Sequence, residues 1–213
     1  MNDVFIYVNG INTKPGDPAA WTDRAVTHTH INSNARAEKF EYFATGIFSR
    51  AHWQRERADN LYEDLIQPYA KTGQYNIHLV GHSNGCDVIL KAIEGISDCV
   101  ESVTLIAPAT ESDCEKNGLL AALEQRRINH VTVMLGGSYD RAVSGWAKLS
   151  QKALGWLANG RYAYGTMGAD GPNGLTSSDV RVSLIRKPLK HSAWFELPEW
   201  NTTMFTILSN IND

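Results

Sequence analysis

The stretch HLVGHSNGCDVIL, residues 78–90, joins an extended run to a helix-like pattern through one short turn. Beyond the turn, apolar side chains recur at helical spacing at Cys86, Ile89, Leu90 and Ile93. Gly81 and Gly85 flank the turn, and their lack of side chains lets a strand and a helix approach closely. Ser83 lies between them. It is therefore either a nucleophile raised on a strand-to-helix elbow or a hydroxyl that caps an ordinary helix N-terminus.

Length and composition favour one domain over residues 1–213. With 213 residues, 43% of them hydrophobic, the chain can bury a sizeable core. The net charge of −3 comes from mixed acids and bases, so nucleic acid is not an expected partner. Three cysteines without close pairs argue against a disulfide framework. The N-terminus lacks the features of a signal peptide, and the apolar runs are too short to span a membrane. We expect a cytoplasmic protein, with export by another route as the alternative.

Short β-branched runs alternate with amphipathic stretches along the chain. The predicted strands are Val4–Val8, Ala37–Phe43, Ile77–Val80, Val103–Ala107, Val131–Leu135 and Val180–Ile185. The predicted helices are Gln54–Tyr69, the segment from the Ser83 turn to Gly95, Gly118–Arg126, Val143–Leu157 and Thr202–Ile211. This alternation predicts an α/β fold, with an open, mostly parallel six-stranded sheet and helices on both faces. The half-polar alternation of Ala37–Phe43 is typical of an edge strand.

Three stretches show no regular pattern. They are Asn9–Ala35, Ala44–Trp53 and the glycine-rich Asn159–Asp179. Long loops in a compact domain are often functional walls or lids, and the sequence leaves open whether the glycine-rich stretch is a lid.

A serine nucleophile needs a base, and the base needs an orienting acid. Of seven histidines, His191 has the favourable position, because it follows the last predicted strand in a turn that returns to the edge carrying Ser83. Asp140 lies five residues beyond the strand Val131–Leu135 and is the preferred acid. Asp113, beyond the preceding strand, is the alternative acid.

The segments GHSNG, GSYDRAV and KHSAWF, in this order, resemble the α/β-hydrolase superfamily. The resemblance implies a triad of Ser83, Asp140 and His191. It also implies an oxyanion hole formed by the backbone N–H groups of Ile11 and Asn84. The chain starts where the family's third strand lies, so the resemblance predicts a sheet that lacks the first two strands, with Ala37–Phe43 at its edge.

The resemblance implies a serine hydrolase, most simply an esterase or lipase-like enzyme that forms an acyl-enzyme. We expect a small-molecule or lipid-like ester as substrate, and no cofactor, metal or membrane span. The substrate-binding candidates are Trp21, Tyr139, Trp194 and Met167. The alternative for these side chains is packing over the sheet. A thioesterase, amidase or acyltransferase, or a non-catalytic binding module, remains an alternative function. The sequence leaves the oligomeric state open.

Overall fold

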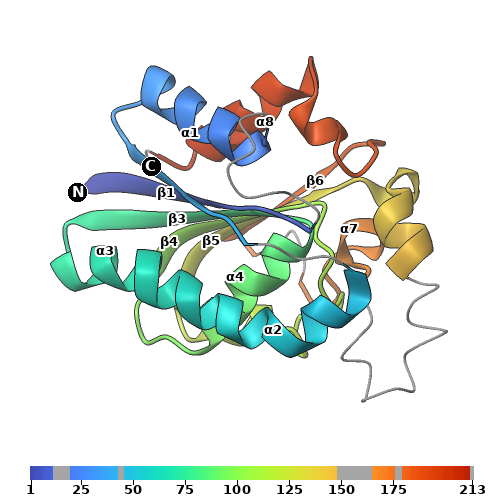
Figure 1. Cartoon of the computed structure of the whole chain (residues 1–213), viewed down its shortest axis with the longest axis horizontal. Helices are drawn as coiled ribbons and strands as arrows, with labels where there is room; N and C mark the ends of the chain where they lie inside the picture. The colour runs from blue at the N-terminus through green and yellow to red at the C-terminus, as the bar shows by residue number, and fades with distance from the viewer. Residues whose placement is uncertain (12–19, 43–45, 148–164, 176–178, 212–213) are drawn as a thin grey trace.

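Six parallel strands form a single sheet in the computed structural model, which describes residues 1–11, 20–42, 46–147, 165–175 and 179–211 (Figure 1). The strands are β1 (Asn2–Val8), β2 (Arg36–Phe40), β3 (Tyr75–His82), β4 (Val100–Ile106), β5 (Ile128–Leu135) and β6 (Val182–Arg186). Their order is β2-β1-β3-β4-β5-β6, and every neighbouring pair is parallel. Strand β2 lies at one edge, as predicted for the stretch Ala37–Phe43.

Helices cover both faces of the sheet, as predicted (Figure 1). One face carries α2 (Gly46–Leu61), α3 (Gln67–Thr72) and α4 (Asn84–Glu94), and the other carries α1 (Trp21–Asn32) and α8 (Glu199–Leu208). Alternate side chains of each strand point to opposite faces. Val4 and Ile6 of β1 therefore belong to the core under α4, whereas Phe5 and Tyr7 belong to the core under α1 and α8.

Helix α1 corrects the prediction that Asn9–Ala35 is irregular. Its sequence contains many β-branched residues, which have modest helix propensity, so the pattern conceals the helix. Packing and hydrogen bonds supply what propensity lacks. Thr29 is buried and its hydroxyl lies 2.6 Å from the Tyr7 hydroxyl, while Trp21 and Ala25 are buried against the sheet. His28 and His30 consequently lie on a helix and not in a loop.

The helical run on the α2 face is longer than the predicted Gln54–Tyr69. It begins at Gly46, so the prediction of irregular structure for Ala44–Trp53 is wrong from that residue onward. The run passes through a π-helical turn at Tyr62–Ile66 into α3, which ends at Thr72 and is followed by the left-handed Gly73. Pro68, which has no N–H to donate within the helix, lies just after the π-helical turn.

The remaining helices match the predictions to within a few residues. Helix α5 spans Leu119–Glu124, and α8 begins three residues before the predicted Thr202. Of the predicted Val143–Leu157 helix, the described part is a π-helical turn at Ala142–Ala147, and the rest lies outside the described residues. None of the helices within the described ranges is both long enough and apolar enough to cross a bilayer.

Part of the glycine-rich stretch Asn159–Asp179 is also regular. Helix α7 (Met167–Asp170) packs against the segment that follows β4, where the backbone N–H groups of Met167 and Gly168 bond to the carbonyls of Thr110 and Pro108. This portion is a fixed wall of the molecule. The rest of the stretch, residues 159–164 and 176–178, lies outside the described residues.

Candidate active site at the carboxyl edge of the sheet

Ser83 occupies the turn between β3 and α4 in a backbone conformation that serine rarely adopts. Its φ and ψ are 55° and −122°, and a non-glycine residue in such a region typically carries about 1–3 kcal/mol of strain. Hydrogen bonds hold the strained residue on both sides, because its N–H donates to Ile106 (3.0 Å) and its carbonyl accepts from Ala109 (3.1 Å). The Ser83 side chain makes no capping hydrogen bond to α4. This geometry is the one expected of a nucleophile elbow, and it does not match a serine cap.

Two glycines make the elbow possible. A Cβ atom added at Gly81 would lie 3.0 Å from the backbone nitrogen of Cys86. One added at Gly85 would lie only 2.4 Å from the carbonyl oxygen of Asn9 and 2.6 Å from that of Val8. The first turn of α4 therefore lies directly on the end of β1, and only a residue without a side chain fits between them.

His191 and Asp140 form a short hydrogen bond on the loops that follow β6 and β5. The His191 Nδ1 atom lies 2.8 Å from Oδ2 of Asp140. Asp140 is fully buried, and its other carboxylate oxygen accepts the N–H of Val143 at 3.1 Å. The His191 side chain is 20% exposed, so its ring remains accessible. A carboxylate on Nδ1 fixes the ring so that Nε2 is the nitrogen free to exchange a proton.

His82 connects Ser83 to the turn that carries His191. Its Nε2 lies 3.1 Å from the His191 carbonyl oxygen, and the two imidazole rings are 4.7 Å apart. Burial, followed by the charge of His191, holds the pKa of His82 well below its ordinary value of 6.5. A neutral His82 whose Nε2–H donates to that carbonyl anchors the His191 turn beside the elbow.

The two predicted oxyanion donors lie on segments that meet at Ser83. Asn84 opens α4, where first-turn N–H groups have no acceptor within the helix. Ile11 follows Gly10, and a Cβ atom added at Gly10 would lie 3.1 Å from Cβ of Ser83. The structure thus brings the Asn9–Ile11 loop against the nucleophile elbow.

The alternative acid Asp113 is paired with other residues. Its side chain is partly buried, forms an ion pair with Lys116 at 3.1 Å, and accepts the N–H of Glu115. The hydrogen bond from Lys116 holds the pKa of Asp113 below its ordinary value. Among the described residues, Asp140 is the carboxylate that contacts His191.

The four substrate-binding candidates separate into one exposed residue and three buried ones. Tyr139 is 62% exposed and lines a groove of about 580 Å³ together with His191, Arg141 and Lys190. Trp194 and Met167 are fully buried in the two cores, and Trp21 is 8% exposed and stacks on Phe195. Packing over the sheet, the alternative reading of these aromatic and sulfur side chains, accounts for all three buried residues.

A buried polar network beneath the elbow escaped sequence reasoning. It consists of Asn9, Tyr42, Gln54, Arg57, Asn84, Asp87 and Thr110, each at least 90% buried. Its members come from segments far apart in the chain. The one available signal was Tyr42, an aromatic residue of the alternating stretch AEKFEYF, and that pattern indicates burial without identifying a partner. In the parts of the chain that the structure describes, no group of three or more His, Cys, Asp or Glu side chains is placed to hold a metal ion.

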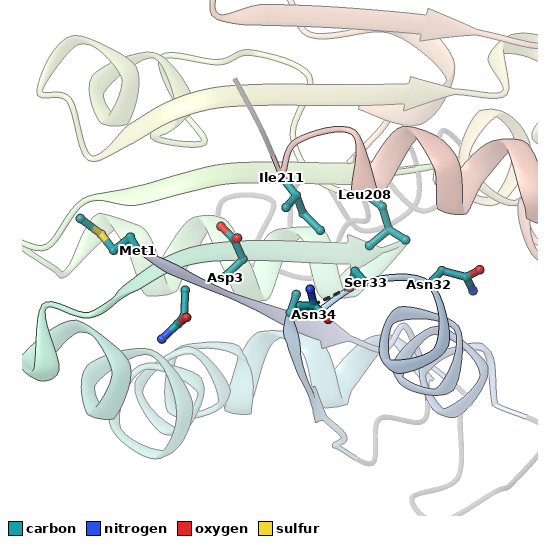
Figure 2. A pocket seen from close by; sticks show the side chains of 9 residues that line it. Met1, Asp3, Asn32, Ser33, Asn34, Leu208 and Ile211 are labelled. Carbon is teal, nitrogen blue, oxygen red and sulfur yellow. Dashed lines mark hydrogen bonds between the residues drawn. The ribbon is translucent and has the colours of Figure 1, made fainter.

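A second serine–histidine–aspartate group lies nearer the amino ends of the strands. His78 bonds through Nδ1 to the Ser102 hydroxyl (2.8 Å) and through Nε2 to Asp3 (3.1 Å). Asp3 also lines a hollow of about 460 Å³ between the start of β1 and the C-terminal ends of α1 and α8, where Asn32, Leu208 and Ile211 lie around it (Figure 2). The ring of His78 stacks on Phe5 at 4.5 Å.

An open parallel sheet of this order, with an elbow after β3 and an acid and a histidine after β5 and β6, is the α/β-hydrolase fold. No protein-family model matches the chain, and no curated protein matches it by sequence. Solved structures do match it.

Carboxyl esterase 2 from the mycorrhizal fungus Tuber melanosporum is 15% identical, with 97% of this chain and 77% of that chain covered and a TM-score of 0.55. Esterase PE8 is 14% identical, with coverage of 98% and 92% and a TM-score of 0.57. Alpha/beta hydrolase domain-containing protein 10 from mouse is 15% identical, with coverage of 98% and 89% and a TM-score of 0.56. At these identities the likeness shows a shared fold.

Proposed function

We propose that the protein is a serine hydrolase that cleaves carboxylic esters through an acyl-enzyme. One observation carries the proposal. The strained Ser83 elbow and the His191–Asp140 pair meet at one edge of the sheet, joined through the His82–His191 contact. The esterases among the structural neighbours support the same class of reaction by analogy of fold.

In the proposed reaction, Nε2 of His191 accepts the Ser83 hydroxyl proton while the serine oxygen bonds to the ester carbonyl carbon. The resulting tetrahedral intermediate collapses, and the alcohol leaves with the proton held by His191. Water then gives a proton to His191 and attacks the acyl-enzyme, which releases the carboxylic acid and restores Ser83. The buried Asp140 carboxylate stabilises the imidazolium that forms in each half of the cycle.

The N–H groups of Ile11 and Asn84 are the proposed donors to the oxyanion. The positions of the two residues support this assignment, because Asn84 begins α4 and the Ile11 loop lies against Ser83. Donors of this kind stabilise negative charge that develops only in the transition state, and losing one typically lowers turnover by about 10²–10³.

The groove beside His191 is the proposed site of the alcohol part of the ester. His191 must deliver a proton to this leaving group, and Tyr139 offers an exposed aromatic surface next to it. The groove lining includes Arg141 and Lys190 and, among the described residues, no carboxylate. A substrate panel should therefore pair neutral esters with esters whose alcohol part carries a carboxylate.

Covalent labelling tests the nucleophile directly. A fluorophosphonate probe should label the wild-type protein and the Ser102→Ala variant equally and should leave the Ser83→Ala variant unlabelled. Ser102 is a matched control because it is buried, as Ser83 is, and because its hydroxyl is hydrogen-bonded to His78. Equal labelling of wild type and Ser83→Ala would overturn the proposal.

The same residues serve thioesterases, amidases and acyltransferases, and a non-catalytic binding module can share the fold. Matched oxygen-ester, thioester and anilide substrates with one acyl group separate the first three, with an alcohol acceptor added to detect acyl transfer. We expect the oxygen ester to be cleaved fastest. A protein that binds esters without turnover or labelling would be a binding module.

A further inference from the structure

Tyr42 lies two residues beyond the end of β2 and contacts both segments that carry the proposed oxyanion donors. The first contact is through its backbone. The Asn9 side chain donates from Nδ2 to the Tyr42 carbonyl and accepts the Tyr42 N–H on Oδ1, both at 3.3 Å. Asn9 is fully buried and immediately precedes Gly10 and Ile11. The amide of Asn9 therefore ties the Ile11 loop to the backbone of residue 42.

The second contact is through the Tyr42 hydroxyl. It accepts a hydrogen bond from Nδ2 of Asn84 at 3.1 Å, although the two residues are 42 positions apart. Both residues are at least 90% buried. Asn84 also carries the other proposed oxyanion donor, its backbone N–H. The side chain and this N–H belong to one residue at the start of α4, and together they form one rigid unit.

Neighbouring side chains hold this unit in place. Nδ2 of Asn84 also donates to Gln54 at 3.3 Å, and Gln54 donates to Asp87 at 2.9 Å. The Arg57 guanidinium lies 4.9 Å from the centre of the Tyr42 ring, a cation–π distance. Burial raises the pKa of Tyr42 above its ordinary value, so the hydroxyl stays protonated. The ring and hydroxyl are thus fixed from several sides.

We propose that Tyr42 is a positioning residue that sets the separation and orientation of the Ile11 and Asn84 N–H groups. This inference rests on the proposed function, because it concerns the oxyanion hole of that reaction. The two donors belong to different segments of the chain, and oxyanion stabilisation depends on their holding a preorganised geometry. Tyr42 bonds to one segment through its backbone and to the other through its hydroxyl.

The test is the Tyr42→Phe variant, which removes the hydroxyl and keeps the ring. We expect kcat for ester hydrolysis to fall about 10- to 100-fold, with KM within about twofold, because misplaced donors lose transition-state binding more than substrate binding. Affinity for a trifluoromethyl ketone, whose adduct places an oxyanion in the hole, should fall by the same factor. The matched control is Tyr69→Phe on α3, which also loses a tyrosine hydrogen bond, the one to Glu38 of β2 at 2.7 Å, and should keep wild-type kinetics.

A second variant covers the case in which Tyr42→Phe folds poorly. Asn84→Ala removes the partner of the hydroxyl and keeps the backbone N–H, so it should lower kcat to a similar extent. The double variant should be no slower than the slower single variant, because both changes break one interaction. Thermal unfolding of each variant separates loss of fold from loss of geometry.

The outcomes distinguish this inference from the function on which it depends. If Ser83→Ala is as active as wild type, the proposed function fails. If Ser83→Ala is inactive while Tyr42→Phe matches Tyr69→Phe in kcat and in ketone affinity, the esterase proposal stands and the role of Tyr42 is overturned. Unchanged kcat with a lowered melting temperature also overturns it, because Tyr42 would then be structural only.

Discussion

The molecule contains two groups of serine, histidine and aspartate at opposite ends of its sheet, and their burial is reversed. At the carboxyl edge, Asp140 is fully buried and the His191 side chain is 20% exposed. Toward the amino ends, the His78 side chain is 1% exposed and Asp3 is 20% exposed. A buried acid with an accessible histidine can pass protons between solvent and substrate. A buried histidine with an accessible acid holds strands together.

The two serines differ in backbone more than in surroundings. Ser102 is part of β4 and pairs with β3 at His78 and with β5 at His130. Ser83 has a φ of 55° and lies directly before the N-terminus of α4. A hydroxyl, an imidazole and a carboxylate within bonding distance therefore do not define a nucleophile. The strained turn and the first-turn N–H groups at the helix start are what single out Ser83 as the proposed nucleophile.

The largest difference between the two groups should appear when each serine is removed. Ser83→Ala should lower kcat for ester hydrolysis on the order of 10⁵–10⁶-fold, since Ser83 is the proposed acyl-enzyme nucleophile. Ser102→Ala should leave kcat within about twofold and lower the free energy of unfolding by about 1 kcal/mol, through the lost bond to His78. Initial rates and urea denaturation check both. A comparable loss of kcat in the two variants would remove the distinction.

Replacing the acids should give the next largest contrast. Asp140→Asn keeps the size of the side chain and removes the charge that fixes and stabilises His191, so kcat should fall about 10³–10⁴-fold. Asp3→Asn should leave kcat within about twofold, because Asp3 contacts His78 and Asn76, both remote from Ser83 in the structure. Steady-state kinetics at pH 7.5 decide between these expectations. Normal turnover by Asp140→Asn would reopen the choice of acid.

The smallest expected effect concerns stability in acid. Burial lowers the pKa of His78, although Asp3 acts in the opposite direction. Below pH 6.5 the unfolded chain takes up a proton that the native His78 resists, so the free energy of unfolding should fall as the pH drops, by at most about 1.4 kcal/mol per pH unit for this one group. Above the pKa of His78 in the unfolded chain, neither state binds this proton, so His78 no longer lowers the free energy of unfolding.

Urea denaturation at pH 7.5 and pH 5.5 measures this acid effect. His78→Gln should reduce the dependence on pH, whereas the exposed His30→Gln should leave it unchanged. The dependence that remains in His78→Gln is expected from His82, whose pKa burial also lowers. Equal pH dependence in wild type and His78→Gln would show that His78 contributes no acid sensitivity.

Sequence patterns were sufficient to predict the strands and the strand-to-helix turn at Ser83, because periodicity and glycine spacing are local signals. The continuous apolar strands, the half-polar edge strand and the Gly81–Gly85 turn each express their structure within ten residues. Helix α1 was missed because Thr29 and its neighbours look unsuited to a helix until Tyr7 is seen beneath them. The Tyr42–Asn84 bond was missed because its two ends are 42 residues apart.

The site shows the same division between local and distant signals. The positions of Asp140 and His191 beyond their strands indicated one shared edge, and the structure places them 2.8 Å apart. Composition alone suggested aromatic walls, and it gave no means of telling the exposed Tyr139 from the buried Trp194. Burial depends on what the folded chain brings over a side chain, which single-sequence patterns do not encode.

The contact of Gly85 with the carbonyls of Val8 and Asn9 limits how this protein can be diversified. Even a methyl group at position 85 would force α4 away from β1, and the nucleophile and the Asn9–Ile11 loop would separate together. Positions 8–10 and 85 consequently form one unit that tolerates change only as a whole. A mutant library aimed at new substrates should keep these positions constant and vary Ser138, Tyr139, Arg141 and Lys190 along the groove.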